Sequence, residues 1–310
     1  MAKKPSTIAD AVHPAADKTF PHFKVSDAEL ENLIARFCND LTAINKAGKR
    51  DPVCGRDNEV DEILTILLHR GRSNVVLLGG AGTGKTAVFH AVAQRIVGGD
   101  VPKMLKDARV LELDFALVGA GTESRGEFEG RLVPFLKGIG ERNETRAYPQ
   151  TVICIDELHT IMRTCTASSA SGVADLLKPY LTVGNLQVIG ATTEVEFDEH
   201  VRRDPAMDRR FQKIVLKQPS VEETIGILKG IRKGYEAHFG ITIPDEACEH
   251  VCKLAQKYIR NRNNPDKSIM VLDGACARFA KEDSPGGVLT LTYIKRAIGA
   301  EINVAPDVIE

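Results

Sequence analysis

The chain has 310 residues, 43% of them hydrophobic, and a formal net charge of −1 with 27% charged residues. This composition is sufficient for one large domain and one smaller domain, and it excludes a disordered chain. The near-neutral charge argues against non-specific binding to nucleic acid or to a membrane surface, although a local basic patch would be compatible with it.

The seven cysteines include no CxxC pair, which argues against a disulfide framework or a zinc site and favours a reducing cytoplasm. Cys248 and Cys252 lie one helical turn apart, and burial explains this spacing better than metal binding does. The N-terminal sequence lacks the apolar segment of a signal peptide, and no run of about 18 apolar residues occurs. We therefore expect a cytoplasmic protein without a membrane span.

Residues 1–24 are predicted to form a flexible arm. An amphipathic helix is expected next, because Ser26 and Glu29 form a capping box and apolar residues recur on one face as far as Gly48. That face comprises Leu30, Leu33, Ile34, Phe37, Leu41 and Ile44. We expect it to pack on the main domain; contact with a partner subunit is the alternative.

Five short apolar runs then alternate with helical sequence, which predicts a parallel sheet covered by helices on both faces. The runs are NVVLL (74–78), RVLELD (109–114), TVICID (151–156), LQVIGATT (186–193) and QKIVLK (212–217). After Pro219, a second capping box formed by Ser220 and Glu223 opens a helix-rich stretch. The sequence therefore predicts an α/β domain over 25–218 and a small helical domain over 219–310.

The sequence GGAGTGKT (79–86) matches the phosphate-binding motif GxxxxGK[ST], directly after a predicted strand and before a predicted helix. Glycines allow the backbone N–H groups of such a loop to point at phosphate, and the helix N-terminus adds partial positive charge. Lys85 is expected to bridge the β- and γ-phosphates of ATP, and Thr86 to supply a hydroxyl ligand to Mg²⁺. The predicted nucleotide-binding residues are Gly79, Gly80, Ala81, Gly82, Thr83, Gly84, Lys85 and Thr86.

The sequence VICIDELH (152–159) is an apolar strand that ends in two adjacent carboxylates. Asp156 is expected to bind Mg²⁺ through water, and Glu157 to orient and activate the water that attacks the γ-phosphate. We expect His159 to be a structural residue more than a catalytic one. Together the two motifs predict a site for ATP or ADP with magnesium.

These motifs, with others in the same order, resemble the AAA+ ATPases of the Clp type, in particular the first ATPase module of bacterial Clp disaggregases and unfoldases. The resemblance covers about residues 45–280. Further stretches that carry it are AGKRDPVCGRDNEV (47–60), RGEFEGRL (125–132), LLKPYL (176–181), IGATTEVEF (189–197), RRFQK (209–213), PSVEETIGILKG (219–230) and NPDKSI (264–269). It implies a five-stranded parallel P-loop sheet covered by helices, a small α-helical lid domain, and a homo-oligomer in the form of a hexameric ring or open spiral.

The resemblance also implies roles for individual residues. Thr193 corresponds to the polar sensor that contacts the γ-phosphate or the attacking water. Arg209 and Arg210 correspond to arginine fingers, which act on the nucleotide of the neighbouring subunit, so that hydrolysis requires an oligomer; a solvated basic pair is the alternative. The residues that correspond to contacts with adenine are Val53, Cys54, Ile227 and Pro265. Relatives usually have a larger aliphatic residue at the position of Cys54.

The loop GAGTESRGEF (119–128) corresponds to the loop that lines the central pore of Clp rings and grips polypeptide. Relatives have a basic residue and a tyrosine before RGEF, whereas this chain has Glu123 and Ser124. Because serine offers far less contact area than an aromatic ring, we expect weakened general threading of polypeptide. Pro134 is expected to kink or end the following helix.

Two functions fit these observations. The first is an ATP-hydrolysing ring that remodels a dedicated protein partner; we expect a stand-alone module, without the second ATPase module, the substrate-recruiting N-terminal domain or the coiled-coil insertion of its relatives. The second is an ATP-switched scaffold or loader in a nucleic-acid or secretion-type assembly. The near-zero net charge argues against nucleic acid as the partner.

Overall fold

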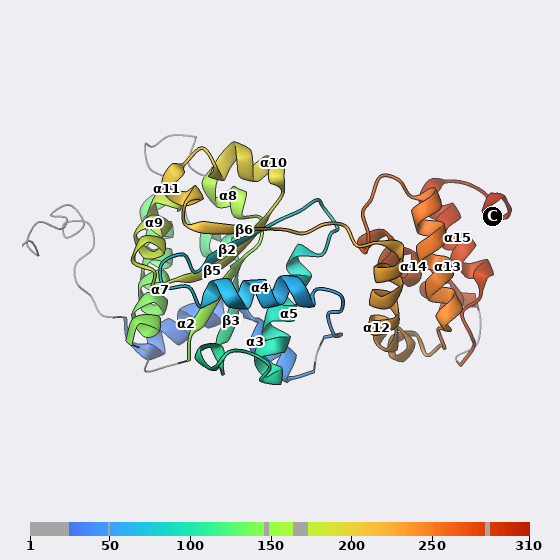
Figure 1. Cartoon of the computed structure of the whole chain (residues 1–310), viewed down its shortest axis with the longest axis horizontal. Helices are drawn as coiled ribbons and strands as arrows, with labels where there is room; N and C mark the ends of the chain where they lie inside the picture. Colours follow the sequence, from blue (N-terminus) through green and yellow to red (C-terminus); the bar gives the residue numbers. More distant parts are fainter. Residues whose placement is uncertain (1–24, 49, 146–148, 164–172, 283–285) are drawn as a thin grey trace, which may run out of the picture.

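A computed structural model describes the chain over residues 25–48, 50–145, 149–163, 173–282 and 286–310. The arm predicted over residues 1–24 lies outside the described residues. Figure 1 shows a larger α/β body and a smaller helical body that lie next to each other along the longest axis of the molecule.

Six strands form one sheet in the order β1-β3-β4-β5-β2-β6. Their bounds are β1 Cys38–Asp40, β2 Asn74–Leu78, β3 Arg109–Leu113, β4 Thr151–Ile155, β5 Gln187–Thr192 and β6 Phe211–Val215. Strands β2 to β6 are parallel, as predicted. The predicted five parallel strands are thus confirmed, and β1 adds a sixth, antiparallel strand at the edge of the sheet, where it pairs with β3 with Cys38 opposite Leu113.

The single helix expected near the N-terminus is interrupted by β1. Helix α2 (Asp27–Phe37) starts at the predicted Ser26 cap, and a separate helix α3 (Leu41–Lys46) follows the strand. Asp40 explains the interruption, because its carboxylate accepts a hydrogen bond from the Ala43 N–H and starts a new helix. The apolar face of α2 is buried in the core, where Leu30 packs against Gly138, as expected for packing on the main domain.

Helices cover both faces of the sheet and create two apolar cores (Figure 1). Their bounds are α4 Asp57–Leu67, α5 Lys85–Gly98, α6 Phe115–Gly119, α7 Arg125–Thr145, α8 Leu158–Arg163, α9 Val173–Val183, α10 Glu194–Glu196 and α11 Pro205–Asp208, with short turns η2 Lys103–Leu105 and η3 Phe197–Val201. Successive residues of β2 enter opposite cores, since side chains alternate along a strand: Val76 packs with α2 and α7, and Val75 with α4 and α5. A strand buried on both faces therefore reads as the continuous apolar run NVVLL.

Helix α7 continues through Pro134, so the expected end of the helix at this residue is wrong. Proline removes one backbone hydrogen bond, at a cost of about 3 kcal/mol. Its neighbours Leu132, Val133, Phe135 and Leu136 are all buried, and burial of such side chains yields about 1.5–3 kcal/mol each. Packing of this face on the sheet therefore outweighs the lost bond.

The helical body has a core of its own. It contains α12 Val221–Phe239, α13 Asp245–Tyr258, α14 Asp266–Glu282, α15 Leu291–Ile302 and the turn η4 Pro306–Val308. The predicted capping box is present, with reciprocal hydrogen bonds between Ser220 and Glu223. Cys248 and Cys252 are fully buried free thiols in this core, as expected. In the described parts of the chain, no helix has both the length and the apolar composition to cross a bilayer.

Candidate nucleotide-binding site

The glycine-rich loop lies between the carboxyl end of β2 and the first residue of α5. Gly82 and Gly84 have φ angles of 76° and 91°, in the left-handed region that other residues rarely adopt. Gly82 is also crowded, since a Cβ atom there would lie 2.8 Å from the Cβ of Asp266. The tight curve that the motif predicts is therefore present, and two independent constraints favour glycine at residue 82.

Lys85 lies within this loop and is only 8% exposed. Its ammonium donates hydrogen bonds to the carbonyl oxygens of Gly79, at 2.9 Å, and Gly80, at 3.1 Å. The positive charge is thus held beside the loop by two weak, neutral acceptors. A phosphate group would be a stronger, charged acceptor for the same ammonium.

Thr86 and Asp156 connect the loop to strand β4. The Thr86 hydroxyl donates to Oδ2 of Asp156 over 2.7 Å. Hydroxyl and carboxylate oxygens are ligands that Mg²⁺ prefers, so the donor set fits this ion. The sequence placed these residues 70 positions apart, and the parallel sheet brings them into contact.

Glu157 follows at the end of β4 with an unusual backbone conformation. Its φ angle is 49°, which is strained for a residue with a side chain, and its N–H donates to Oδ1 of Asp156 over 2.9 Å. Its side chain is 56% exposed. The strained turn therefore directs the carboxylate away from the core, as a residue that contacts bound water requires.

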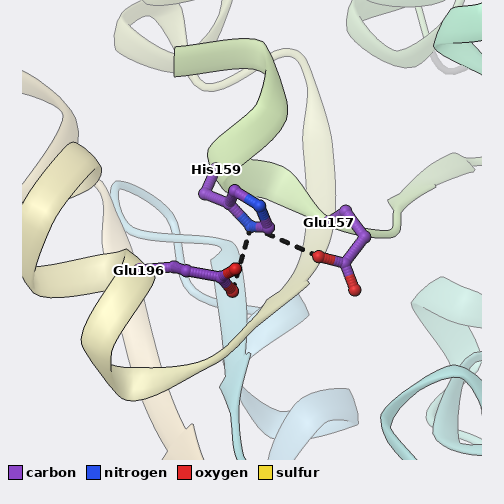
Figure 2. Close-up of side chains that lie close together, drawn as sticks. All are labelled: Glu157, His159 and Glu196. Carbon is purple, nitrogen blue, oxygen red and sulfur yellow. Dashed lines mark ion pairs between the residues drawn. The ribbon is translucent and has the colours of Figure 1, made fainter. Parts of the chain in front are cut away.

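His159 is buried between two carboxylates, those of Glu157 and Glu196, which Figure 2 shows on two sides of the imidazole ring. Its Nδ1 atom lies 3.4 Å from Oε2 of Glu157 and 3.2 Å from Oε2 of Glu196. It also lies 2.9 Å from the Thr192 hydroxyl. Glu157, His159 and Glu196 form the one cluster in the described residues whose spacing would suit a metal ion.

Thr193, the expected sensor, is the N-cap of the short helix α10. Its hydroxyl donates to Oε2 of Glu196 over 2.8 Å, and the Glu196 N–H donates back to it. Partial burial alone would raise the pKa of Glu196. The hydrogen bonds from Thr193, together with the electrostatic effect of the nearby His159, outweigh burial and lower this pKa. Sequence reasoning missed Glu196, although the capping-box spacing from Thr193 to Glu196 was a signal for it.

Arg209 and Arg210 lie between α11 and β6, at the edge of the sheet. Arg209 is exposed, and Arg210 is half-buried with an Nε atom that has no hydrogen-bond partner among the described residues. No contact between described residues joins either guanidinium to the phosphate loop. Arg209 is therefore accessible to another molecule, whereas the Nε atom of Arg210 is buried.

The helical body contacts the α/β body in two places near the phosphate loop, and the first involves residues that precede and begin α14. Asn263 donates from Nδ2 to the carbonyl of Ala81 over 3.0 Å, and the Asp266 N–H to the carbonyl of Gly82 over 3.4 Å. These residues border a cavity of about 380 Å³. Pro265, one of the expected adenine contacts, lies between them in the chain.

The other expected adenine contacts lie at the second point. The Val53 N–H donates to Oε1 of Gln94 over 3.0 Å. The Sγ atom of Cys54 packs so closely on α12 that a Cβ atom at Gly230 would lie 2.4 Å from it, and buried Ile227 lies on the same helix. The small thiol at residue 54 therefore permits close contact between the two bodies.

A larger cavity, of about 680 Å³, lies at the other end of the strands, away from the phosphate loop. Its lining includes Ser73, Gln150 and Gln187, which lie at or before the amino ends of β2, β4 and β5. Ligands of open α/β sheets bind beyond the carboxyl ends of the strands. This cavity therefore lies at the end of the sheet where such ligands do not bind.

The parallel sheet, the glycine loop after β2 and the carboxylates after β4 define a P-loop nucleotide-binding protein. The family model described as "ATPase family associated with various cellular activities (AAA)" matches residues 75–215, and that of the AAA lid domain matches residues 220–298. The chain belongs to the AAA ATPases, and the predicted resemblance to the Clp type is confirmed by its relatives.

Two curated relatives illustrate this similarity. The chaperone protein ClpB of Propionibacterium freudenreichii is 43% identical over 263 residues, which cover 84% of this chain and 30% of the relative. Heat shock protein hsp98 of Neurospora crassa is 40% identical over 305 residues, which cover 97% of this chain and 32% of the relative. The chain thus spans about a third of the length of these relatives.

Solved structures of Hsp104 share the fold. One, a closed state with ATPγS and FITC-casein, has a TM-score of 0.80 and 37% identity and covers 87% of this chain and 45% of its own. The Saccharomyces cerevisiae Hsp104–ADP complex has a TM-score of 0.78 and 37% identity, with coverages of 86% and 45%.

Proposed function

We propose that this chain binds ATP or ADP with Mg²⁺ at the phosphate loop and hydrolyses ATP. One observation carries the proposal: Lys85, Thr86 and Asp156 converge at the carboxyl ends of β2 and β4, and Glu157 follows with an exposed carboxylate. The titration of ATP into the purified protein, followed by calorimetry, tests it. Absence of binding heat would contradict the assignment.

Each residue has a distinct proposed task. Lys85 and the N–H groups of the loop bind the phosphates, and Thr86 and Asp156 hold Mg²⁺, which when bound neutralises charge on the phosphate oxygens. Glu157 orients the attacking water and accepts its proton. Thr193 contacts the γ-phosphate or that water, and Val53, Cys54, Ile227 and Pro265 surround adenine.

The Glu157→Gln variant separates binding from hydrolysis. We expect ATP affinity within about threefold of wild type and a turnover number lower by about 10²–10⁴-fold, because glutamine cannot accept the proton. Steady-state ATPase assays beside calorimetry measure both quantities. Near-normal turnover would remove Glu157 from this role.

We further propose that the chain acts as a homo-oligomer, a hexameric ring or open spiral. The exposed side chain of Arg209 supports this, since a guanidinium from a neighbour can neutralise charge that develops on the transferred phosphoryl group. In this proposal, the arginine beside the transferred phosphoryl group comes from a second copy of the chain and not from the subunit that binds the nucleotide.

A mixing experiment tests the contribution of the neighbour. Arg210→Ala should retain ATP affinity and lose at least about 10³-fold in turnover. Glu157→Gln subunits lack the base but keep their arginines, so a mixture of the two variants should hydrolyse ATP faster than either alone. A mixture no faster than its components would favour a role for Arg210 within its own subunit.

For the biological role, we propose remodelling of a dedicated protein partner with weakened general threading. Ser124 precedes α7, and its hydroxyl accepts a hydrogen bond from the Glu127 N–H, while Glu123 presents a carboxylate beside it. This turn offers no aromatic surface for a translocating chain. The alternative is an ATP-switched scaffold or loader; an ATPase that responds to no protein partner at all, and not merely to no model polypeptide such as casein, would support it.

We also infer boundaries at residues 25–218 for the α/β domain and 219–310 for the lid domain. The separate core of α12 to α15 supports this division. The six cysteines in the described part of the chain are free, which supports a reducing compartment such as the cytoplasm.

A further inference from the structure

The imidazole of His159 connects two segments of the candidate site that come from the neighbouring strands β4 and β5. Glu157 and His159 belong to the segment after β4, whereas Thr192 is the last residue of β5 and Glu196 belongs to the segment after it. Figure 2 shows the Nδ1 side of the ring between the two carboxylates. Within the described residues, the polar contacts of Nδ1 are with the side chains of Glu157, Thr192 and Glu196.

The surroundings determine where the proton of the ring lies. Two carboxylate oxygens approach Nδ1 within 3.4 Å, and a bare lone pair there would face two negative charges. Nδ1 is therefore the protonated nitrogen, and it donates to the group of acceptors around it. The Thr192 hydroxyl, 2.9 Å from Nδ1, in turn donates to Oε2 of Glu196 over 3.2 Å.

Glu196 is the point at which these contacts meet. Its Oε2 atom accepts from the hydroxyls of Thr192 and Thr193 and from the Thr193 N–H, and it lies next to His159. The orientation of Thr193 is thus tied to the position of one carboxylate. That carboxylate also fixes the imidazole that contacts Glu157.

Glu157 has few constraints of its own. Its backbone is held in a strained turn, and its side chain is more than half exposed. Within the described residues, its carboxylate makes a polar side-chain contact with His159. His159 itself is buried, and its ring stacks on that of His200 with 6.2 Å between the ring centroids. These contacts restrict the orientation of the imidazole.

We propose that His159 and Glu196 are positioning residues that hold the carboxylate of Glu157 and the hydroxyl of Thr193 in one connected arrangement. The inference rests on the proposed ATPase function and extends it. The ring donates toward Glu157, Glu196 anchors the ring, and the same carboxylate orients Thr193. Neither residue touches the nucleotide, so their effect is on turnover and not on binding.

Substitution of His159 by Leu and by Asn tests this inference. Leu removes the N–H donor, and we expect turnover to fall about tenfold while KM and ATP affinity stay within about threefold of wild type. Asn can place an N–H close to the position of Nδ1 and should restore most of the turnover. Equal turnover in the Leu variant and wild type would overturn the proposal.

A double variant distinguishes positioning from a merely structural effect. If His159 acts through Glu157, then His159→Leu should cause no further loss in the Glu157→Gln background, measured by single-turnover hydrolysis. A further tenfold loss in that background would overturn the proposal. Thermal unfolding of each variant monitors the fold.

Glu196→Gln provides a test outside the buried ring, should the Leu variant not fold. Glutamine keeps the shape and an acceptor for Thr193 but removes the charge next to His159, so turnover should fall about threefold with unchanged ATP affinity. Unchanged turnover would contradict the role of Glu196. A wild-type chain that neither binds nor hydrolyses ATP would refute the proposed function itself, whereas wild-type hydrolysis insensitive to both substitutions refutes only this inference.

Discussion

Two glycine-rich loops of this chain look alike in sequence and differ in structure. Residues 79–84 follow β2, and residues 120–124 follow β3 and the short helix α6. In the first loop, added Cβ atoms at Gly79 and Gly82 would each meet another atom at 2.8 Å. In the second, Gly121 has nothing within 4 Å, although its φ angle is 67°.

This difference separates two uses of glycine. In the phosphate loop, glycine permits both a left-handed turn and close contact with neighbouring backbone and lid residues, which creates a rigid concave surface. At Gly121, glycine serves only the turn, and the surrounding space stays open. Glycine in the sequence therefore predicts a turn in both loops. The close contacts around the turn, which only the structure shows, distinguish the phosphate loop from the second loop.

The largest effect on this comparison is expected from Lys85→Ala. Loss of the ammonium inside the phosphate loop should weaken ATP binding by about 100-fold or more, since a charged hydrogen-bonding partner of the phosphates is removed. Calorimetry measures the change, with the exposed Lys103→Ala as a matched control that should bind normally. Retained wild-type affinity would mean that the first loop is not a phosphate site.

A paired substitution sharpens the comparison directly. Gly82→Ala introduces strain and a clash with Asp266, and we expect ATP affinity to fall about tenfold. Gly121→Ala introduces only the backbone strain, so stability should fall by about 1 kcal/mol with ATP affinity unchanged. Chemical denaturation and calorimetry give the two quantities. Equal effects of the two alanines on affinity would remove the distinction between the loops.

The smallest expected effect concerns the second loop. Ser124→Tyr adds an aromatic ring where the resemblance to Clp rings implies one, and we expect casein to stimulate the ATPase of this variant by about twofold and to leave wild type unchanged. Ser124→Ala is the matched control without a ring. Strong stimulation of the wild type by casein would contradict the proposal of weakened threading.

Tertiary structure decided the features that depend on residues far apart in the chain. Strand β1 exists because three residues pair with β3, and local sequence favoured a helix there. Pro134 stays inside α7 because its neighbours are buried, an effect invisible to a rule about proline alone. The contact between Asn263 and Ala81 joins residues 182 positions apart.

The sequence by itself determined the five parallel strands, the Ser26 helix cap, the capping box of Ser220 and Glu223, and the phosphate loop, because each depends on local periodicity, local hydrogen bonds or the backbone freedom of glycine. The sequence did not predict the contacts that connect Glu157 through His159 to Glu196. That link forms only where β4 and β5 lie side by side with Ile155 opposite Gly190, so that the segments after both strands emerge at the same edge. The order of residues in the chain does not show that these two segments are neighbours, because only the pairing of β4 with β5 brings them together.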